Sequence, residues 1–307
     1  MDHINCATLN VRGLRKKSKR ESLFAYLNSK NINIACLQET YCTQDFSEMF
    51  NRNWNGEVFH SFASSSHCKG VCILINLKCE YKVLNIHKDD DGRKLLLNIM
   101  IDDKMYTIIS VYCPNNVNER TAFLKHLNVW TKQHCQSVDN IICGGDFNCT
   151  INIIDRKTKG YVDTSSNCLK KYLSNFNLCD VWRRLNPDTS AFTYVDPSRR
   201  GYDSRIDYLF YSHNLSCNVI NCSIIPAPVP DHNAVECKLR LKESKRGPGI
   251  WKMNTSVLGE NDYVTAIKDI IKQTIIDYNE VGCKLTWELC KVRIQEFTNA
   301  YCIQRSR

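Results

Sequence analysis

The chain has 307 residues, of which 43% are hydrophobic, and its 41 lysine and arginine residues outnumber 32 acidic ones to give a net charge of +9. This length allows one large domain or two smaller ones, and the apolar content supports a sizeable core. No run approaches the roughly 18 consecutive apolar residues of a membrane span, and the N-terminus lacks the order of a signal peptide, so we expect an intracellular chain that is neither membrane-bound nor secreted.

The 18 cysteines do not predict a disulfide scaffold. Several lie inside apolar runs, where a free cysteine behaves as a small buried hydrophobe, and no two have the Cys-x-x-Cys spacing of a zinc module. An intracellular location would also keep the thiols reduced. We therefore expect free cysteines.

The first part of the chain has the pattern of a β-α-β unit. Residues 3–11 and 32–38 are predicted as strands, and residues 16–30 as a helix between them. Six basic side chains follow the first strand: Arg12, Arg15, Lys16, Lys17, Lys19 and Arg20. Such a cluster favours a polyanionic partner, with the solvated start of a helix as the alternative.

The middle of the chain is predicted to be antiparallel. Its expected strands are residues 58–63, 70–77, 81–87, 94–101 and 106–113, and Asp102-Asp103-Lys104 forms the turn of a hairpin. A helix with Phe123, Leu124, Leu127 and Trp130 on one face follows. The apolar run 140–143 then leads into Gly144-Gly145-Asp146.

The last part of the chain changes in character after residue 241. Before it we expect a helix near 169–176 and strands at 191–195, 205–211, 219–225 and 234–241. A polar, Gly- and Pro-containing segment and two amphipathic helices come next. We therefore divide the chain into a catalytic domain (1–242), a linker (243–250) and a helical tail (251–307).

Four acids and one histidine occur at the ends of predicted strands: Glu39, Asp146, Asp207, Asp231 and His232. Oxygen ligands select a hard cation, which suits Mg²⁺ with Mn²⁺ as a substitute. Mg²⁺ usually takes one or two protein carboxylates, and Glu39, directly after a buried strand, is the strongest candidate ligand. Together with the basic cluster, these residues predict a metal-dependent phosphodiesterase.

The remaining polar residues suggest roles in that reaction. We expect Asp146 to deprotonate the attacking water and Asn148, on the same face of an extended segment, to hold the water or the phosphate. Asp207 would keep His232 charged against the phosphate. Tyr112 and Asn115 would donate hydrogen bonds to phosphate oxygens. Each motif alone is explained as well by a turn, a cap or an ion pair, so the interpretation depends on their conjunction.

Six motifs occur in the order typical of the exonuclease-endonuclease-phosphatase superfamily, which the chain resembles over residues 3–242. They are Leu9-Asn10-Val11-Arg12-Gly13-Leu14, Gln38-Glu39-Thr40, Tyr112-Cys113-Pro114-Asn115, Gly145-Asp146-Phe147-Asn148, Arg205-Ile206-Asp207-Tyr208 and Asp231-His232. The resemblance implies an α/β fold, a four-layer α/β/β/α sandwich of two mixed, mainly antiparallel sheets followed by a short helical tail. It also implies that the metal is bordered by Asn10, Glu39, Asp146 and Asp231.

Within that superfamily the chain looks most like the endonuclease domain of LINE-type non-LTR retrotransposon proteins. The residues that carry this resemblance are Phe192-Thr193-Tyr194, Ser204-Arg205-Ile206-Asp207 and residues 246–254. This resemblance implies Mg²⁺-dependent nicking of double-stranded DNA to leave 3′-hydroxyl and 5′-phosphate ends, in the nucleus with the cytoplasm as an additional location. The expected substrate contacts are Asn115, Thr193, Ser204, Arg205, Arg12, Lys16 and Lys17. No obligate protein partner is indicated, and the tail is expected to be a truncated lead-in to an absent reverse transcriptase.

Two alternatives stay open. An abasic-site repair endonuclease or exonuclease uses the same residues, and a catalytically inactive remnant could still bind nucleic acid. Two departures also matter. Arg12 stands where the repair endonucleases carry an acid, which argues against a two-metal site, and Pro230 replaces the serine usual before Asp231-His232. We expect these departures to reduce activity without abolishing it.

Overall fold

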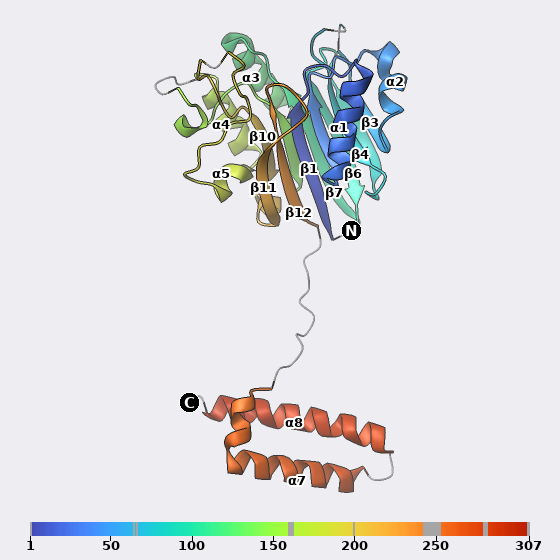
Figure 1. The fold of residues 1–307 in the computed structure, drawn as a ribbon, viewed down its shortest axis with the longest axis vertical. Coiled ribbons are helices and arrows are strands. Elements are labelled where there is room, and N and C mark those ends of the chain that lie inside the picture. Colours follow the sequence, from blue (N-terminus) through green and yellow to red (C-terminus); the bar gives the residue numbers. More distant parts are fainter. Residues whose placement is uncertain are drawn as a thin grey trace. The chain divides into compact units, whose positions relative to one another are not determined.

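The computed structural model describes residues 2–63, 65, 67–158, 163–198, 200–241, 253–278 and 282–305. The chain divides into two compact units, Met1–Glu243 and Ser244–Arg307 (Figure 1). The predicted linker, residues 243–250, lies outside the described residues.

Two six-stranded sheets form the centre of the first unit. One has the order β11-β12-β1-β2-β4-β3 and the other β5-β6-β7-β8-β10-β9. The first comprises β1 (His3–Asn10), β2 (Ile34–Gln38), β3 (Gly56–Ser61), β4 (Val71–Asn76), β11 (Val219–Pro226) and β12 (Asn233–Arg240). The second comprises β5 (Lys82–Lys88), β6 (Lys94–Ile101), β7 (Lys104–Tyr112), β8 (Ile141–Asp146), β9 (Leu178–Asp180) and β10 (Asp207–Ser212). Among the described strands, β1 pairs with β2 and β7 with β8 in parallel, while the other neighbours are antiparallel.

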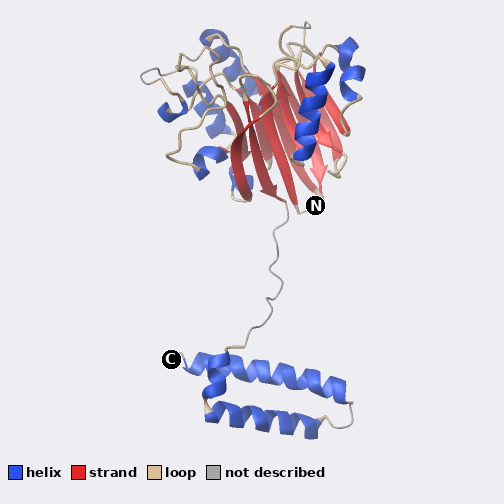
Figure 2. Ribbon diagram, in the orientation of Figure 1, coloured by secondary structure: helices blue, strands red, loops and turns tan. Residues whose placement is uncertain are grey.

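Helices cover the outer faces of both sheets (Figure 2). Leu23 and Leu27 of α1 pack with the first sheet, and Leu124 of α3 and Leu169 of α4 pack with the second. The sheets bury their inner faces against each other around residues such as Ile73, Leu97 and Leu209. The helices of this unit are α1 (Lys17–Ser29), α2 (Ser47–Asn51), α3 (Val117–His134), α4 (Ser166–Asn175), α5 (Val181–Leu185) and α6 (His213–Ser216). The predicted four-layer sandwich is confirmed.

Some local predictions need correction. The predicted strand at 191–195 is not a strand; Tyr194 makes only isolated bridges, to Ser204 and His232. Strand β9 and the helices α2, α5 and α6 were not predicted, because elements of three to five residues are too short for a periodic pattern. The hairpin turn is confirmed, with Asp102 and Asp103 both in the left-handed region.

All 18 cysteines are free, and many lie in the core, as predicted. Burial raises the pKa of the thiols, to about 12 for Cys143 and well above the ordinary value for Cys36 and Cys72. These thiols are therefore neutral packing groups at physiological pH.

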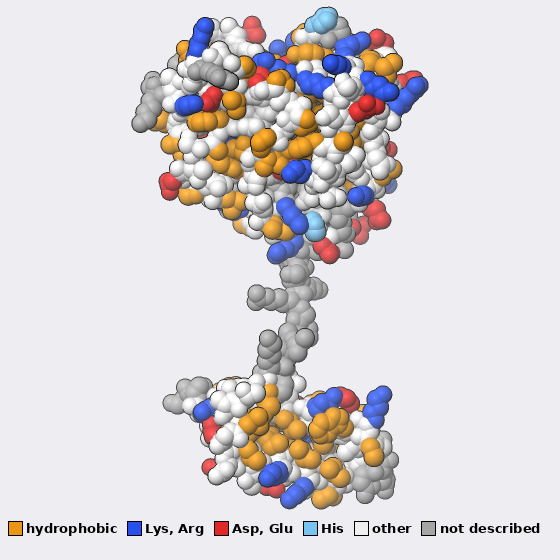
Figure 3. All heavy atoms as spheres, viewed as in Figure 1, with side chains coloured by type: hydrophobic (Ala, Val, Ile, Leu, Met, Phe, Trp, Pro, Cys, Tyr) orange, Lys and Arg blue, Asp and Glu red, His pale blue; other side chains and the backbone are white. Residues whose placement is uncertain are grey.

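The second unit contains α7 (Asn261–Asp277) and α8 (Cys283–Arg305), so the predicted helical tail is present. Tyr263 is buried between the helices and shares a 2.5 Å hydrogen bond with Thr298. Apolar side chains also gather on the visible surface of this unit (Figure 3), and Ile276 and Trp287 are among its exposed hydrophobic residues. Within the described parts of the chain, we find no helix with the length and apolarity needed to cross a membrane.

Candidate active site

Most of the residues predicted from strand ends meet around a pocket of about 350 Å³. Pairing explains why they meet: Asn10 and Gln38 are in register at the ends of the parallel strands β1 and β2. In the second sheet, Asp146 lies opposite both Tyr112 and Asp207. The pocket is lined by Asn10, Arg12, Glu39, Asn115, Asp146, Asn148, Arg156, Tyr194, Tyr202, Ser204, Ile206 and His232.

Asn10 joins two of the carboxylates. Its Nδ2 donates to Glu39 Oε1 at 2.8 Å and to Asp146 Oδ2 at 2.9 Å, while its Oδ1 accepts from the Arg12 N–H at 3.1 Å. Tyr41 donates to the other oxygen of Glu39 at 2.8 Å. Asn10 thus orients the carboxylates as a donor, and its predicted role as a metal ligand stays a prediction.

Asp146 is placed to act as a base. The Asn148 N–H donates to its Oδ1 at 2.9 Å, and the Asn148 side chain donates to the Cys113 carbonyl at 2.9 Å. Burial and then the adjacent Asp207 carboxylate raise the pKa of Asp146 to about 7. A carboxyl with this pKa can accept a proton efficiently near neutral pH.

His232 and Asp207 form the predicted pair, with 2.9 Å between His232 Nδ1 and Asp207 Oδ2. Burial opposes a charge on the ring, but the Asp207 carboxylate outweighs it, so the pKa of His232 rises to about 9. Tyr194 packs against the ring edge-on. His232 is therefore charged at neutral pH, and its Nε2, for which the described residues supply no acceptor, remains for an anionic ligand.

Three non-glycine residues of the pocket have left-handed backbones: Arg12 (φ 43°), Glu39 (φ 53°) and Asn148 (φ 50°). This conformation costs about 1–2 kcal/mol for each residue with a Cβ. Hydrogen bonds hold it, including one of 2.6 Å from the Gly13 N–H to the Glu39 carbonyl. Strain held in this way marks positions where side-chain direction matters more than stability.

The predicted substrate-binding residues divide into three groups. Asn115, Ser204 and Arg12 line the pocket as predicted. Tyr112 is 7% exposed beside it, and burial and the Glu39 carboxylate raise its pKa, so the phenol stays protonated. Lys16 and Lys17 are exposed at the start of α1 and do not line the pocket.

Arg205 and Thr193 have structural positions instead. Arg205 is 1% exposed, and four of the five N–H donors of its guanidinium bond to Asp155 and Asp180. Thr193 is fully buried, and its Oγ1 accepts from the N–H groups of residues 206 and 207 at 3.0 Å each. Both residues fix the start of β10 and thereby position Asp207, while their contact with substrate stays a prediction.

The donor atoms suit a hard cation. Asp207 Oδ1 and both oxygens of Asp231 are buried and accept no hydrogen bond within the described residues. Ligand atoms of Asp146, Asp207 and His232 also lie within 4.8 Å of one another. Because the imidazolium of His232 cannot bind a metal, the oxygens of Glu39 and the aspartates are the better ligands.

Several residues of the pocket were not predicted. Tyr41, Tyr194, Tyr202 and Arg156 reach it from turns and loops, where no periodic pattern marks a direction. Lys19 was seen only as part of a basic cluster, but its Nζ donates to the Arg12 carbonyl at 2.8 Å. Arg20, from the same cluster, is buried and donates to the carbonyls of residues 14 and 15.

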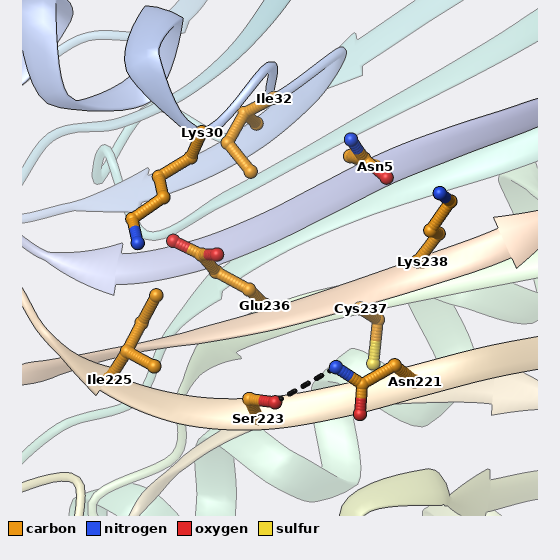
Figure 4. A pocket seen from close by; sticks show the side chains of 9 residues that line it. All are labelled: Asn5, Lys30, Ile32, Asn221, Ser223, Ile225, Glu236, Cys237 and Lys238. Atoms are coloured by element: carbon orange, nitrogen blue, oxygen red, sulfur yellow. Dashed lines mark hydrogen bonds between the residues drawn. The ribbon is translucent and has the colours of Figure 1, made fainter.

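Another hollow lies on the outer face of β1, β11 and β12 (Figure 4). Its volume is about 270 Å³, and its charged residues are Lys30, Glu236 and Lys238. With one carboxylate and no histidine, it does not offer the catalytic groups of the first pocket.

Comparisons with known proteins identify the family and the fold of the chain. A sequence profile of the Endonuclease/Exonuclease/phosphatase family matches residues 7–229. The chain is 29% identical over 310 residues to the Transposon TX1 uncharacterized 149 kDa protein of Xenopus laevis. That alignment covers 99% of this chain and 24% of the relative, so the chain spans about a quarter of its length.

Solved structures share the fold. The AP endonuclease LMAP of Leishmania major has a TM-score of 0.65 at 17% identity, covering 78% of this chain and 89% of that one. An AP endonuclease of Archaeoglobus fulgidus has a TM-score of 0.64 at 19% identity, covering 76% and 98%. The endonuclease domain of TRAS1, a telomere-specific non-LTR retrotransposon, has a TM-score of 0.61 at 18% identity, covering 78% and 100%.

Proposed function

Because the chain belongs to the Endonuclease/Exonuclease/phosphatase family, we propose that it is a Mg²⁺-dependent DNA endonuclease that nicks double-stranded DNA, as at the target site of a retrotransposon. The observation that carries this proposal is the pocket in which Asn10 joins Glu39 to Asp146 beside the His232–Asp207 pair. The similarity to the TX1 transposon protein supports the choice of a retroelement.

The chain's own residues account for the steps. Asp146, with its pKa near 7, takes the proton of the attacking water. Asn148, whose N–H donates to Asp146, holds that water in position. The imidazolium of His232 neutralises a non-bridging phosphate oxygen. A divalent cation bound by Glu39 and a neighbouring aspartate would stabilise the leaving oxygen. The products carry 3′-hydroxyl and 5′-phosphate ends, and the protein acts in the nucleus.

The proposal is tested by incubating supercoiled plasmid with the protein in Mg²⁺ and, separately, in EDTA. We expect nicked circles in Mg²⁺ alone, whose 3′ ends are extended by a polymerase without prior phosphatase treatment. Glu39→Ala should leave the fold intact and abolish nicking, while Glu48→Ala, on the short helix α2 outside the pocket, should nick normally. Full nicking by Glu39→Ala would refute the assignment of the metal ligand.

An abasic-site endonuclease is the second candidate, favoured by the structural similarity to two AP endonucleases. A duplex with one abasic site and the same duplex without it separate the two functions. Cleavage confined to the abasic duplex would show that the protein is an abasic-site endonuclease and would refute the retroelement function. A protein that binds both duplexes and cleaves neither would be an inactive remnant.

A further inference from the structure

Arg12 holds an unusual place in the pocket. It follows β1 in a left-handed conformation, its side chain is 46% exposed, and it lines the pocket. Its Nη1 lies 2.8 Å from Oδ2 of Asp231, whose side chain is 1% exposed. Within the described residues, this is the contact that its guanidinium makes, so most of its five N–H donors remain available.

A second cation supports the same carboxylate. Lys19 reaches from α1 to the Arg12 carbonyl, and burial lowers the pKa of Lys19 while the Asp231 and Glu39 carboxylates oppose that shift. Asp231 accepts no directed hydrogen bond from the described residues, although Arg12 lies close to it. The positive charges of Arg12 and Lys19, and not hydrogen bonds from neutral N–H or O–H groups, therefore neutralise the Asp231 carboxylate.

Two buried arginines differ from Arg12, and the difference shows that the Arg12–Asp231 pair is not purely structural. Arg205 and Arg120 are 1% and 3% exposed, and carboxylate, hydroxyl and carbonyl oxygens accept from four of the five N–H donors of each. Arg12 instead keeps a strained backbone and an open side toward the pocket. Strain maintained for an exposed cation indicates that the cation meets a ligand.

We propose that Arg12 is a fixed cation of the active site, which contacts a phosphate of the bound DNA strand and, by occupying Asp231, restricts the pocket to one divalent cation. This inference rests on the proposed function, because it takes DNA as the ligand. A guanidinium fork suits the oxygens of a phosphate, and it needs no ion from solution.

Two measurements test the two halves, with the full chain. Binding of a fluorescent duplex in EDTA at several salt concentrations gives the number of phosphates that the protein neutralises, and titration with Mn²⁺ followed by electron paramagnetic resonance gives the number of bound ions. Arg12→Ala should flatten the salt slope by about 0.9 and should raise the Mn²⁺ count from one to two. Lys104→Ala removes the same charge at the end of β7 that is far from the pocket, and it should change neither the salt slope nor the Mn²⁺ count.

Two further variants keep the result interpretable. Arg12→Ala/Asp231→Asn should keep the flattened slope but return to one Mn²⁺, and Arg12→Lys should bind one Mn²⁺ with nearly the wild-type slope. Two ions on the wild type, or an unchanged slope for a folded Arg12→Ala, would overturn the inference. Failure of the wild type to nick plasmid would instead refute the proposed function, since the ion count and the salt slope do not depend on cleavage.

Discussion

Two regions of the first unit that contain buried carboxylates differ in how those carboxylates are hydrogen-bonded. Around Asp155, the oxygens accept from Arg183, Arg205 and the N–H of Asn152. Around the pocket, Asp207 and Asp231 keep buried oxygens that accept no hydrogen bond within the described residues. Burial alone therefore does not separate the two regions; they differ in that the pocket contains buried oxygens of Asp207 and Asp231 without a donor, beside Glu39 and Asp146, which do accept hydrogen bonds.

We expect the largest effect on the turnover rate from the substitution Asp146→Asn. Removing a general base lowers the turnover rate by about 10²–10⁴-fold. The melting temperature should stay level or rise, because the substitution removes a carboxylate whose charge is opposed by burial and by Asp207. Plasmid nicking and a thermal melt check both parts, and a large loss of stability would place Asp146 with the structural acids.

Asp155→Asn should have the opposite signature. It leaves the buried guanidinium of Arg205 partly unpaired, which costs about 3–5 kcal/mol of unfolding free energy. For a domain of this size the melting temperature falls by roughly 6–20 °C. Nicking per folded molecule at low temperature should persist. Selective loss of nicking with an unchanged melt would show that the contrast between the two regions is wrong.

Asp207→Asn tests the electrostatic coupling in the pocket. The wild type needs Asp146 deprotonated and His232 protonated, so activity should rise near pH 7 and fall near pH 9. The Asp207 carboxylate raises both pKa values, so both limbs of the profile should move to lower pH in the variant. Movement of one limb alone would mean that the two groups do not share this carboxylate.

The smallest effect concerns the exposed lysines of α1. Lys16→Ala/Lys17→Ala should flatten the salt dependence of DNA binding by up to about 0.9 for each phosphate that the variant no longer neutralises. Turnover at saturating DNA should not change, since neither residue lines the pocket. Lys82→Ala/Lys104→Ala, at the far ends of β5 and β7, is the matched control. If both double variants show the same salt dependence of DNA binding, the bound DNA does not contact the start of α1.

The sequence predicts the sandwich well because its strands and long helices have clear apolar periods. The strand ends also place Glu39, Asp146 and His232 correctly around one pocket. Arg205 could not be assigned in this way. A basic residue next to a catalytic aspartate looks the same in sequence whether its fork meets phosphate or, as here, carboxylates from the distant residues 155 and 180.

The direction of Asn10 was also beyond the sequence. Its amide nitrogen faces the carboxylates only because the left-handed turn at Arg12 brings an N–H to its oxygen. Pairing between β8 and β10, which sets Asp146 opposite Asp207, joins segments about sixty residues apart and leaves no local signal. Register and backbone strain are thus the information that the fold adds.

The reactivity of the buried cysteines can be used to measure local unfolding of the protein. Exposed Cys68, Cys217 and Cys283 can react with an alkylating reagent at once, whereas Cys36 and Cys143 lie between the layers with strongly raised pKa values. Their labelling requires the sandwich to open, so the mass gained over time measures the local unfolding free energy at each layer. Wild-type protein therefore carries built-in probes of its dynamics, and no label has to be engineered into it.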